Sequence, residues 1–315
     1  MKRIVVIGNG KMAIDCLKIM VGNPGVDLPL VITEPKNCSV VDSASSYCEQ
    51  EGIPHLETTK PGSAEVFDEL RRIDPHLIFN INSYKMIREP ILSLPEEGVI
   101  NFHNGPLPKY GGVNVCSWAI INGEKEHGVT WHYMDQGIDT GDIIAQTLFP
   151  IDANETAISL IIKCLYQGVD LFGEIFPKIV EGDVQRIKQD LSNATYFSLR
   201  DFPNDGEVDF NWSFEKMDRF VRGLTFYPMV NNFMHPGSAY QGRKFYIERV
   251  QRIDSRFDDV DCGKVIGVKE NKLIVPIRDA IVGITEVLDD KKKELGIPDF
   301  VERYKIREGE YLGTR

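Results

Sequence analysis

The chain has 315 residues, which exceeds one average domain, and its 42% apolar and 26% charged residues are ordinary for a globular protein with ample core. Its formal net charge of −11 disfavours nonspecific binding to nucleic acid, although a local basic patch can exist within an acidic total. The apolar run at the N-terminus is too short for a signal sequence, and nothing approaches the length of a transmembrane span. We therefore expect two domains in a cytoplasmic protein with no membrane partner.

Cysteine usage agrees with a reducing compartment. The six cysteines, at positions 16, 38, 48, 116, 164 and 262, are scattered without paired spacing, and several lie in apolar segments where a free thiol behaves as a small hydrophobe. The chain also lacks HxxxH, HxH and CxxC motifs, so we predict no metal site.

The N-terminal strand runs directly into a glycine-rich turn. The strand RIVVIG ends at Gly8. Gly10 and Ala13 then follow at the spacing of a dinucleotide-binding fingerprint, and Glu34 closes the next predicted strand. The same turn is useful in any doubly wound sheet, because small residues let helix and strand pack closely and a helix N-terminus attracts anions. We favour a structural use or a substrate phosphate over a dinucleotide, with Gly8, Gly10 and Lys11 as candidate substrate contacts.

Strands and helices alternate over the following residues. Strands are predicted over 26–33 and 76–83, an extended segment over 53–56, and helices around 43–52 and 64–73. This alternation is typical of a Rossmann-like α/β domain with a mostly parallel sheet, whose ligand crevice lies at the carboxyl ends of the strands.

The stretch 99–146 concentrates polar reactive groups. Residues 99–103 read as a short buried strand that presents Asn101 and His103 on one face, because side chains two apart on a strand point the same way. A turn-rich loop, a short helix over 113–122 and a strand over 127–134 follow. The next turn can return Asp139 toward the first strand, where an amide, an imidazole and a carboxylate could polarise a carbonyl and move a proton. Alternatively, Asn101 caps a turn, His103 is a satisfied core histidine and Asp139 forms a turn.

This stretch resembles a known family. Asn-x-His before a proline-containing loop, together with GVTWHYMDQGIDTGDI, is similar to the formyltransferases that use N10-formyltetrahydrofolate, such as methionyl-tRNA, UDP-aminoarabinose and other amino-sugar formyltransferases. The similarity is strongest over 77–146. It implies that Asn101, His103 and Asp139 are the catalytic residues, that formyltetrahydrofolate is the cosubstrate and that no metal is required. We expect Asn101 and protonated His103 to bind the oxyanion, with Asp139 keeping the imidazolium available at neutral pH.

The resemblance also implies which residues contact folate. The loop after the strand at 76–83 lines the pterin slot in the family, and further contacts follow the catalytic histidine and precede the aspartate. The candidates are Tyr84, Met86, Ile87, Gly105, Pro106, Leu107, Pro108, Gly137 and Ile138. For Met86 and Ile87, ordinary core packing is an equally good explanation.

The chain departs from the methionyl-tRNA enzymes in the loop after His103. Those enzymes carry Ser and Arg where this chain has Gly105 and Gly111, and the missing Arg removes a forked donor suited to phosphate or carboxylate. Their basic insertion after the second strand is replaced here by TEPKNCSVVD, which has one lysine. We therefore expect a small amine acceptor, most simply a nucleotide-linked amino sugar, contacted by Lys109 and Tyr110. Methionyl-tRNA and, with water as acceptor, formyltetrahydrofolate hydrolysis are the alternatives, and nucleic acid is considered an unlikely partner.

The C-terminal part has a different pattern of predicted helices and strands. A helical stripe over 156–181 ends at Gly182, a polar connector follows, and Ser213 is a plausible N-cap for the next helix. Short alternating strands after 238 predict a small barrel, and the resemblance implies an OB-like domain, with Tyr227 a candidate substrate contact. We expect a catalytic domain over 1–184, a linker over 185–205, the OB-like domain over 206–298 and a tail over 299–315. The sequence leaves a homo-oligomer open.

Overall fold

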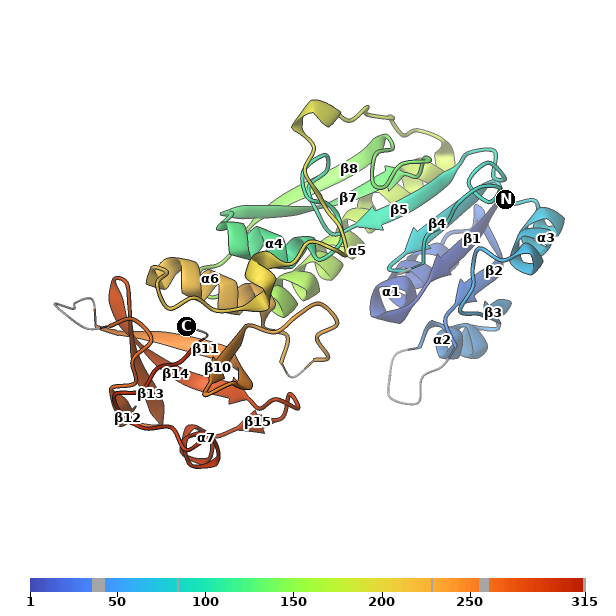
Figure 1. The fold of residues 1–315 in the computed structure, drawn as a ribbon. Coiled ribbons are helices and arrows are strands. Elements are labelled where there is room, and N and C mark those ends of the chain that lie inside the picture. The colour runs from blue at the N-terminus through green and yellow to red at the C-terminus, as the bar shows by residue number, and fades with distance from the viewer. Residues whose placement is uncertain (36–42, 84, 228, 255–260, 314–315) are drawn as a thin grey trace. The chain divides into compact units, whose positions relative to one another are not determined.

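The structure, a computed structural model, describes residues 1–35, 43–83, 85–227, 229–254 and 261–313 (Figure 1). The chain forms two compact units. The first contains Met1–Gly112, His127–Phe149 and Ile162–Phe197, and the second contains Val113–Glu126, Pro150–Ile161 and Ser198–Arg315. Within the described residues, no helix is long and apolar enough to cross a membrane.

A seven-stranded sheet forms the centre of the first unit, in the order β3-β2-β1-β4-β5-β7-β8. The strands are β1 (Lys2–Gly8), β2 (Val26–Thr33), β3 (His55–Glu57), β4 (Leu77–Ile81), β5 (Val99–His103), β7 (Glu126–Tyr133) and β8 (Ile143–Pro150). Pairing is parallel from β3 to β5, and β7 runs antiparallel to β5. The mostly parallel Rossmann-like sheet that the alternating pattern predicts is confirmed.

Helices cover both faces of this sheet. They are α1 (Gly10–Val21), α2 (Ala44–Glu51), α3 (Ala64–Ile73) and α5 (Ala157–Glu181). On one face, Ile78 of β4 lies in a buried cluster with Leu70 of α3. On the other, the adjacent Phe79 contacts Phe172 of α5 edge to face, with ring centroids 5.4 Å apart. Neighbouring strand residues thus face opposite layers, which explains why the central strands are largely apolar.

The second unit is built on an antiparallel sheet in the order β10-β11-β14-β13-β12, with β15 paired to β14. Its strands are β10 (Gly237–Tyr240), β11 (Arg243–Asp254), β12 (Gly267–Lys269), β13 (Lys272–Ile277), β14 (Ala280–Leu288) and β15 (Glu294–Leu295). Its helices are α4 (Val115–Asn122), α6 (Phe214–Leu224), α7 (Ile297–Tyr304) and the 3-10 turn Pro203–Gly206. The hydroxyl of Ser213 accepts the backbone N–H of Lys216, which confirms the predicted N-cap of α6.

The described cysteines are free thiols, in line with the scattered spacing. Burial raises the pKa of Cys48 to about 11 and that of Cys16 further still, so both thiols are protonated and unreactive at neutral pH. Cys38 lies outside the described residues.

Candidate active site

Asn101 lies between two polar side chains on neighbouring strands. It stands opposite Asn80 of β4 and opposite His132 of β7 in the sheet register. Asn80 Nδ2 donates to Asn101 Oδ1 at 2.7 Å, and Asn101 Nδ2 lies 3.0 Å from His132 Nε2. Both sides of the Asn101 amide are therefore held by the sheet, while the residue itself stays partly accessible. Asn80 and His132 were not candidates from the sequence, because their nearness to Asn101 depends on strand register.

His103 ends β5 and is 5% exposed. Its Nε2 donates to the carbonyl oxygen of Tyr110 at 2.7 Å, and its Nδ1 lies 3.5 Å from Asp139 Oδ2. A Cβ added at Gly105 would lie 2.7 Å from His103 Nε2 and 2.6 Å from the Tyr110 oxygen. Gly105 thus leaves room for the bond that anchors Nε2, and Nδ1 is the ring nitrogen that faces the carboxylate.

Asp139 reaches this place from the turn between β7 and β8. Its backbone is left-handed, with φ of 57°, a conformation that aspartate tolerates better than most residues. Its Oδ2 accepts the backbone N–H of Gly112 at 2.8 Å, and Gln189 Nε2 donates to its carbonyl oxygen at 2.8 Å. The structure therefore brings together the three residues predicted to act in catalysis, although they are distributed over 39 positions of the sequence.

Burial and the neighbouring groups together set the charges of Asp139 and His103. Burial acts to raise the pKa of Asp139, but its interactions with His103 and His132 and the Gly112 hydrogen bond outweigh it and lower that pKa to about 2. For His103, burial outweighs Asp139 and the Tyr110 carbonyl, and its pKa is lowered. The expectation that Asp139 keeps His103 protonated at neutral pH is therefore wrong. The resting cluster is an ionised aspartate beside a neutral imidazole.

The loop after His103 is braced by the sheet. Thr130 Oγ1 donates to the Gly105 oxygen at 2.7 Å and accepts the Leu107 amide at 3.2 Å, and Gln146 Nε2 donates to the Leu107 oxygen at 2.8 Å. Leu107 is buried, with its side chain in the interior, and Pro106 is half-buried. Of these predicted folate contacts, Pro106 and Pro108 are partly accessible, whereas Gly105 and Leu107 are buried.

The other predicted folate contacts differ in exposure. Met86 is 53% exposed and Ile138 is 45% exposed, so both offer apolar surface to a ligand, and Gly137 lies in the same turn as Ile138. Ile87 is 2% exposed within the core cluster of the sheet, which accounts for it without a ligand. Tyr84 lies outside the described residues.

The predicted linker supplies part of the site wall. The short strands β6 (Gly111–Gly112) and β9 (Tyr196–Phe197) pair in parallel, just after the 3-10 turn Leu191–Asn193. Tyr110 stacks on Phe197 with ring centroids 5.5 Å apart, and its amide donates to Thr195 Oγ1 at 2.8 Å. Lys109 is exposed beside them. These contacts of the connector had no sequence signal, because a two-residue strand leaves no periodic pattern.

Two adjacent glycines in β6 provide a matched test. Gly112 has φ of 93°, and a Cβ there would collide with the Phe197 carbonyl oxygen, whereas a Cβ at Gly111 would meet its nearest atom, the Thr195 oxygen, at 3.5 Å. We expect Gly112→Ala to displace the amide that holds Asp139, to lower the free energy of unfolding by about 1–3 kcal/mol and to reduce turnover. Gly111→Ala should leave both unchanged. Equal melting temperatures and rates for the two variants would contradict this assignment.

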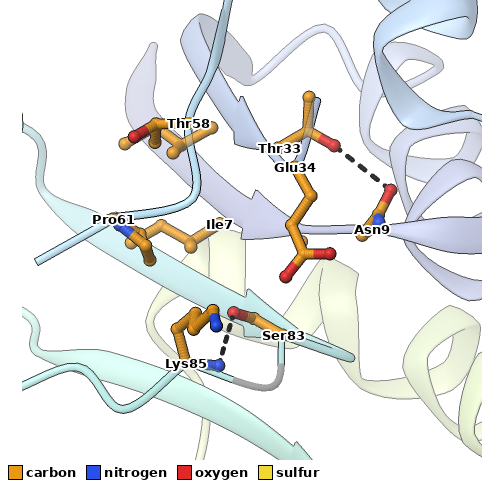
Figure 2. Close-up of a pocket in the computed structure, with 10 residues that line it drawn as sticks. Ile7, Asn9, Thr33, Glu34, Thr58, Pro61, Ser83 and Lys85 are labelled. Carbon is orange, nitrogen blue, oxygen red and sulfur yellow. Dashed lines mark hydrogen bonds between the residues drawn. The ribbon is translucent and has the colours of Figure 1, made fainter. Parts of the chain in front are cut away.

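The glycine turn after β1 has structural reasons for its glycines. A Cβ at Gly8 would lie 2.6 Å from the Ile81 oxygen, and Gly10 has φ of 71°. Figure 2 shows the crevice beside this turn, with the Glu34 carboxylate between Asn9 and Ser83. The cavity measures about 10 Å³, which accommodates about one water molecule.

The remaining predicted substrate contacts are occupied by protein partners. Lys11 forms an ion pair with Asp15 one turn along α1. In the second unit, the Tyr227 hydroxyl donates to Glu294 Oε2 at 2.5 Å, and the ring is 45% exposed.

Known proteins resemble the chain over nearly its full length. The model of the Formyl transferase family matches residues 2–174, and that of the Formyl transferase C-terminal domain matches residues 202–305. The methionyl-tRNA formyltransferase of Alkaliphilus oremlandii is 29% identical over 323 residues, covering 99% of each protein. That of Caldanaerobacter subterraneus subsp. tengcongensis is 30% identical over 317 residues, covering 98% of this chain and 99% of the relative.

Among solved structures, an N-formyltransferase from Helicobacter canadensis in complex with folinic acid and dTDP-3-aminofucose has a TM-score of 0.68. It is 23% identical and the match covers 90% of this chain and 99% of that one. The likeness agrees with the Rossmann-like fold.

Proposed function

Because the chain belongs to the formyltransferase family and is an N-formyltransferase, we propose that it moves the formyl group of N10-formyltetrahydrofolate to the primary amine of a nucleotide-linked amino sugar. The observation that carries the chemistry is the convergence of Asn101, His103 and Asp139, with the histidine and aspartate 3.5 Å apart. This arrangement supplies a hydrogen-bond donor, a base and a charge that stabilises the protonated base.

The residues divide the work of acyl transfer. The free Nδ2–H of Asn101 donates to the carbonyl oxygen as negative charge develops on it. The neutral imidazole of His103 accepts, at Nδ1, the proton that the amine loses as its nitrogen bonds to the formyl carbon. His103 then gives this proton to the departing nitrogen as the old carbon–nitrogen bond breaks, and ionised Asp139 stabilises the transient imidazolium.

The surroundings of the three residues fit a folate. Met86 and Ile138 are exposed apolar side chains of the kind that cover a flat aromatic ring in a ligand site. The loop from Gly105 to Pro108 offers backbone groups held in place by Thr130. When bound there, formyltetrahydrofolate supplies the electrophilic carbonyl carbon.

The glycine at position 111 supports the choice of acceptor. A Cβ at Gly111 would lie 3.8 Å from the Asp139 Cβ, so position 111 borders the reacting groups. Arginine at this position, as the family resemblance implies for methionyl-tRNA enzymes, would present a forked cation there. Glycine instead leaves space, which suits a compact sugar carrying its amine into the site.

Methionyl-tRNA is the second candidate. Relatives named as methionyl-tRNA formyltransferases match 99% of the chain, including both units, so the comparisons do not support the expectation that nucleic acid is an unlikely partner. The acidic net charge does not exclude a tRNA site formed by a local patch.

A single assay distinguishes the acceptors. The purified full chain is supplied with N10-formyltetrahydrofolate and, in parallel, with dTDP- and UDP-linked amino sugars, with initiator methionyl-tRNA, or with no acceptor. We expect tetrahydrofolate release and an N-formylated product, detected by mass spectrometry, with at least one amino sugar. Formylation of the tRNA with all sugars inert would overturn the proposal, and equal formate release without acceptor would identify a hydrolase.

A further inference from the structure

A second buried histidine lies beside the catalytic residues. His132 is 1% exposed in the middle of β7, directly opposite Asn101 in the antiparallel β5–β7 pair. Its Nε2 lies 3.0 Å from Asn101 Nδ2 and 3.6 Å from Asp139 Oδ1. Opposite residues in such a pair have side chains in contact, so the register itself fixes this neighbour.

The hydrogen bonds around His132 specify its tautomer. Its Nδ1 lies 2.8 Å from the carbonyl oxygen of Tyr133, which can only accept, so Nδ1 carries a hydrogen. In the neutral imidazole, Nε2 is then an acceptor, and the only donor within hydrogen-bond distance among the described contacts of that atom is Asn101 Nδ2. Asp139 Oδ1 lies 3.6 Å from the same nitrogen, beyond hydrogen-bond distance.

The chain of bonds through Asn101 therefore has one direction. Asn80 donates to Asn101 Oδ1 at 2.7 Å, Asn101 donates to His132 Nε2, and His132 donates to the Tyr133 oxygen. The two possible orientations of the Asn101 amide are not equivalent here, because the flipped one would place Asn101 Oδ1 against the lone pair of His132 Nε2. One Nδ2–H is used by His132, and the other remains for the reacting carbonyl.

From this geometry we propose that His132 is a positioning residue, which acts as a neutral Nδ1–H imidazole to hold the Asn101 amide with its second N–H aimed at the formyl oxygen. The inference rests on the proposed role of Asn101 in acyl transfer. It assigns His132 no contact with substrate. A misplaced donor costs rate rather than affinity, because the hydrogen bond matters most when charge develops on the oxygen.

Two substitutions of His132 separate the roles of its ring nitrogens. In His132→Gln, the longer side chain places an amide oxygen near the position of Nε2, where it can accept from Asn101. In His132→Asn, the shorter side chain reaches only the position of Nδ1 and can keep the bond to Tyr133. We expect His132→Asn to lower kcat about 10²-fold, with the KM values for folate and for the amine little changed. We expect the kcat of His132→Gln to be at least about tenfold higher than that of His132→Asn.

A double-mutant cycle ties the effect to Asn101. Asn101→Ala should itself reduce kcat, and adding His132→Asn in that background should cause no further loss. Equal rates for the Asn and Gln variants, or fully multiplicative losses in the cycle, would overturn the positioning role. If Asn101→Ala and His103→Ala both kept wild-type rates, the proposed function of the site would fail instead, so the two failures are distinguishable.

A measurement on the wild-type chain guards against variants that do not fold. Long-range ¹H–¹⁵N spectra of protein labelled with ¹⁵N-histidine report which ring nitrogen carries the hydrogen. We expect the His132 ring to show a protonated Nδ1 and a bare Nε2 at neutral pH. A protonated Nε2 would remove the acceptor for Asn101 and would overturn the proposal without any mutation.

Discussion

Replacing His103 with alanine is expected to lower kcat by about 10²–10⁴-fold, the usual contribution of a positioned acid–base group. In the proposed mechanism the imidazole Nδ1 accepts the amine proton, and Asp139, at 3.5 Å, is ionised and cannot replace it efficiently because its pKa is about 2. Tetrahydrofolate release and formation of the N-formyl product should fall together. Retention of near wild-type turnover by a folded His103→Ala protein would refute the assignment.

His103→Ala also has a structural cost that must be measured separately. The substitution leaves the Tyr110 carbonyl without the hydrogen bond it receives from Nε2 in a buried place. Loss of such a bond costs about 1–3 kcal/mol, so thermal melts should be compared at the assay temperature. His55→Ala is the matched control, because His55 lies on β3 and its Nδ1 contacts only the nearby Ile53 oxygen, at 3.3 Å, in the described hydrogen bonds. It should leave kcat unchanged.

The sheet and the shared face of Asn101 and His103 could be predicted because each depends on local pattern. The strand that ends at His103 places Asn101 on the same face through its two-residue period, and no tertiary information is needed. The alternation of strands and helices predicts parallel pairing for a similar reason. The proposed catalytic roles came from the family resemblance, which the domain matches support at the level of the family.

The partner of Asn101 and the charge of His103 could not be predicted in this way. His132 meets Asn101 only because β7 pairs antiparallel with β5 in one register. From His127 to Tyr133 β7 is buried, so it shows no alternation of exposure that would indicate which face His132 lies on. The pKa of His103 is lowered by burial, which outweighs the opposing effects of Asp139 and the Tyr110 hydrogen bond, and burial depends on the whole fold rather than on local pattern. The expected domain boundaries stay a prediction, because Tyr196 and Phe197 of the expected linker over 185–205 pair with β6.

Asp139→Asn is expected to lower kcat by about 10²-fold or more and to shift the acid limb of the pH profile to lower pH. Asparagine tolerates the left-handed backbone of this position, and its side-chain oxygen can still accept the Gly112 amide, so the turn should persist. The loss should therefore come from charge, because the transient imidazolium at His103 no longer has an anion at 3.5 Å.

The sign of the pH shift follows from the neutral imidazole being the active form. In the wild type, activity falls as pH drops through the His103 pKa, which burial places below its usual value of about 6.5. Asp139 opposes that lowering, so its neutralisation lowers the His103 pKa further, and the variant should keep more of its own plateau activity under acidic conditions. Profiles of kcat/KM against pH test this, with Asp142→Asn as control, because the Asp142 charge acts on Tyr133. Activity that falls as pH rises through the His103 pKa would show instead that protonated His103 is the active form.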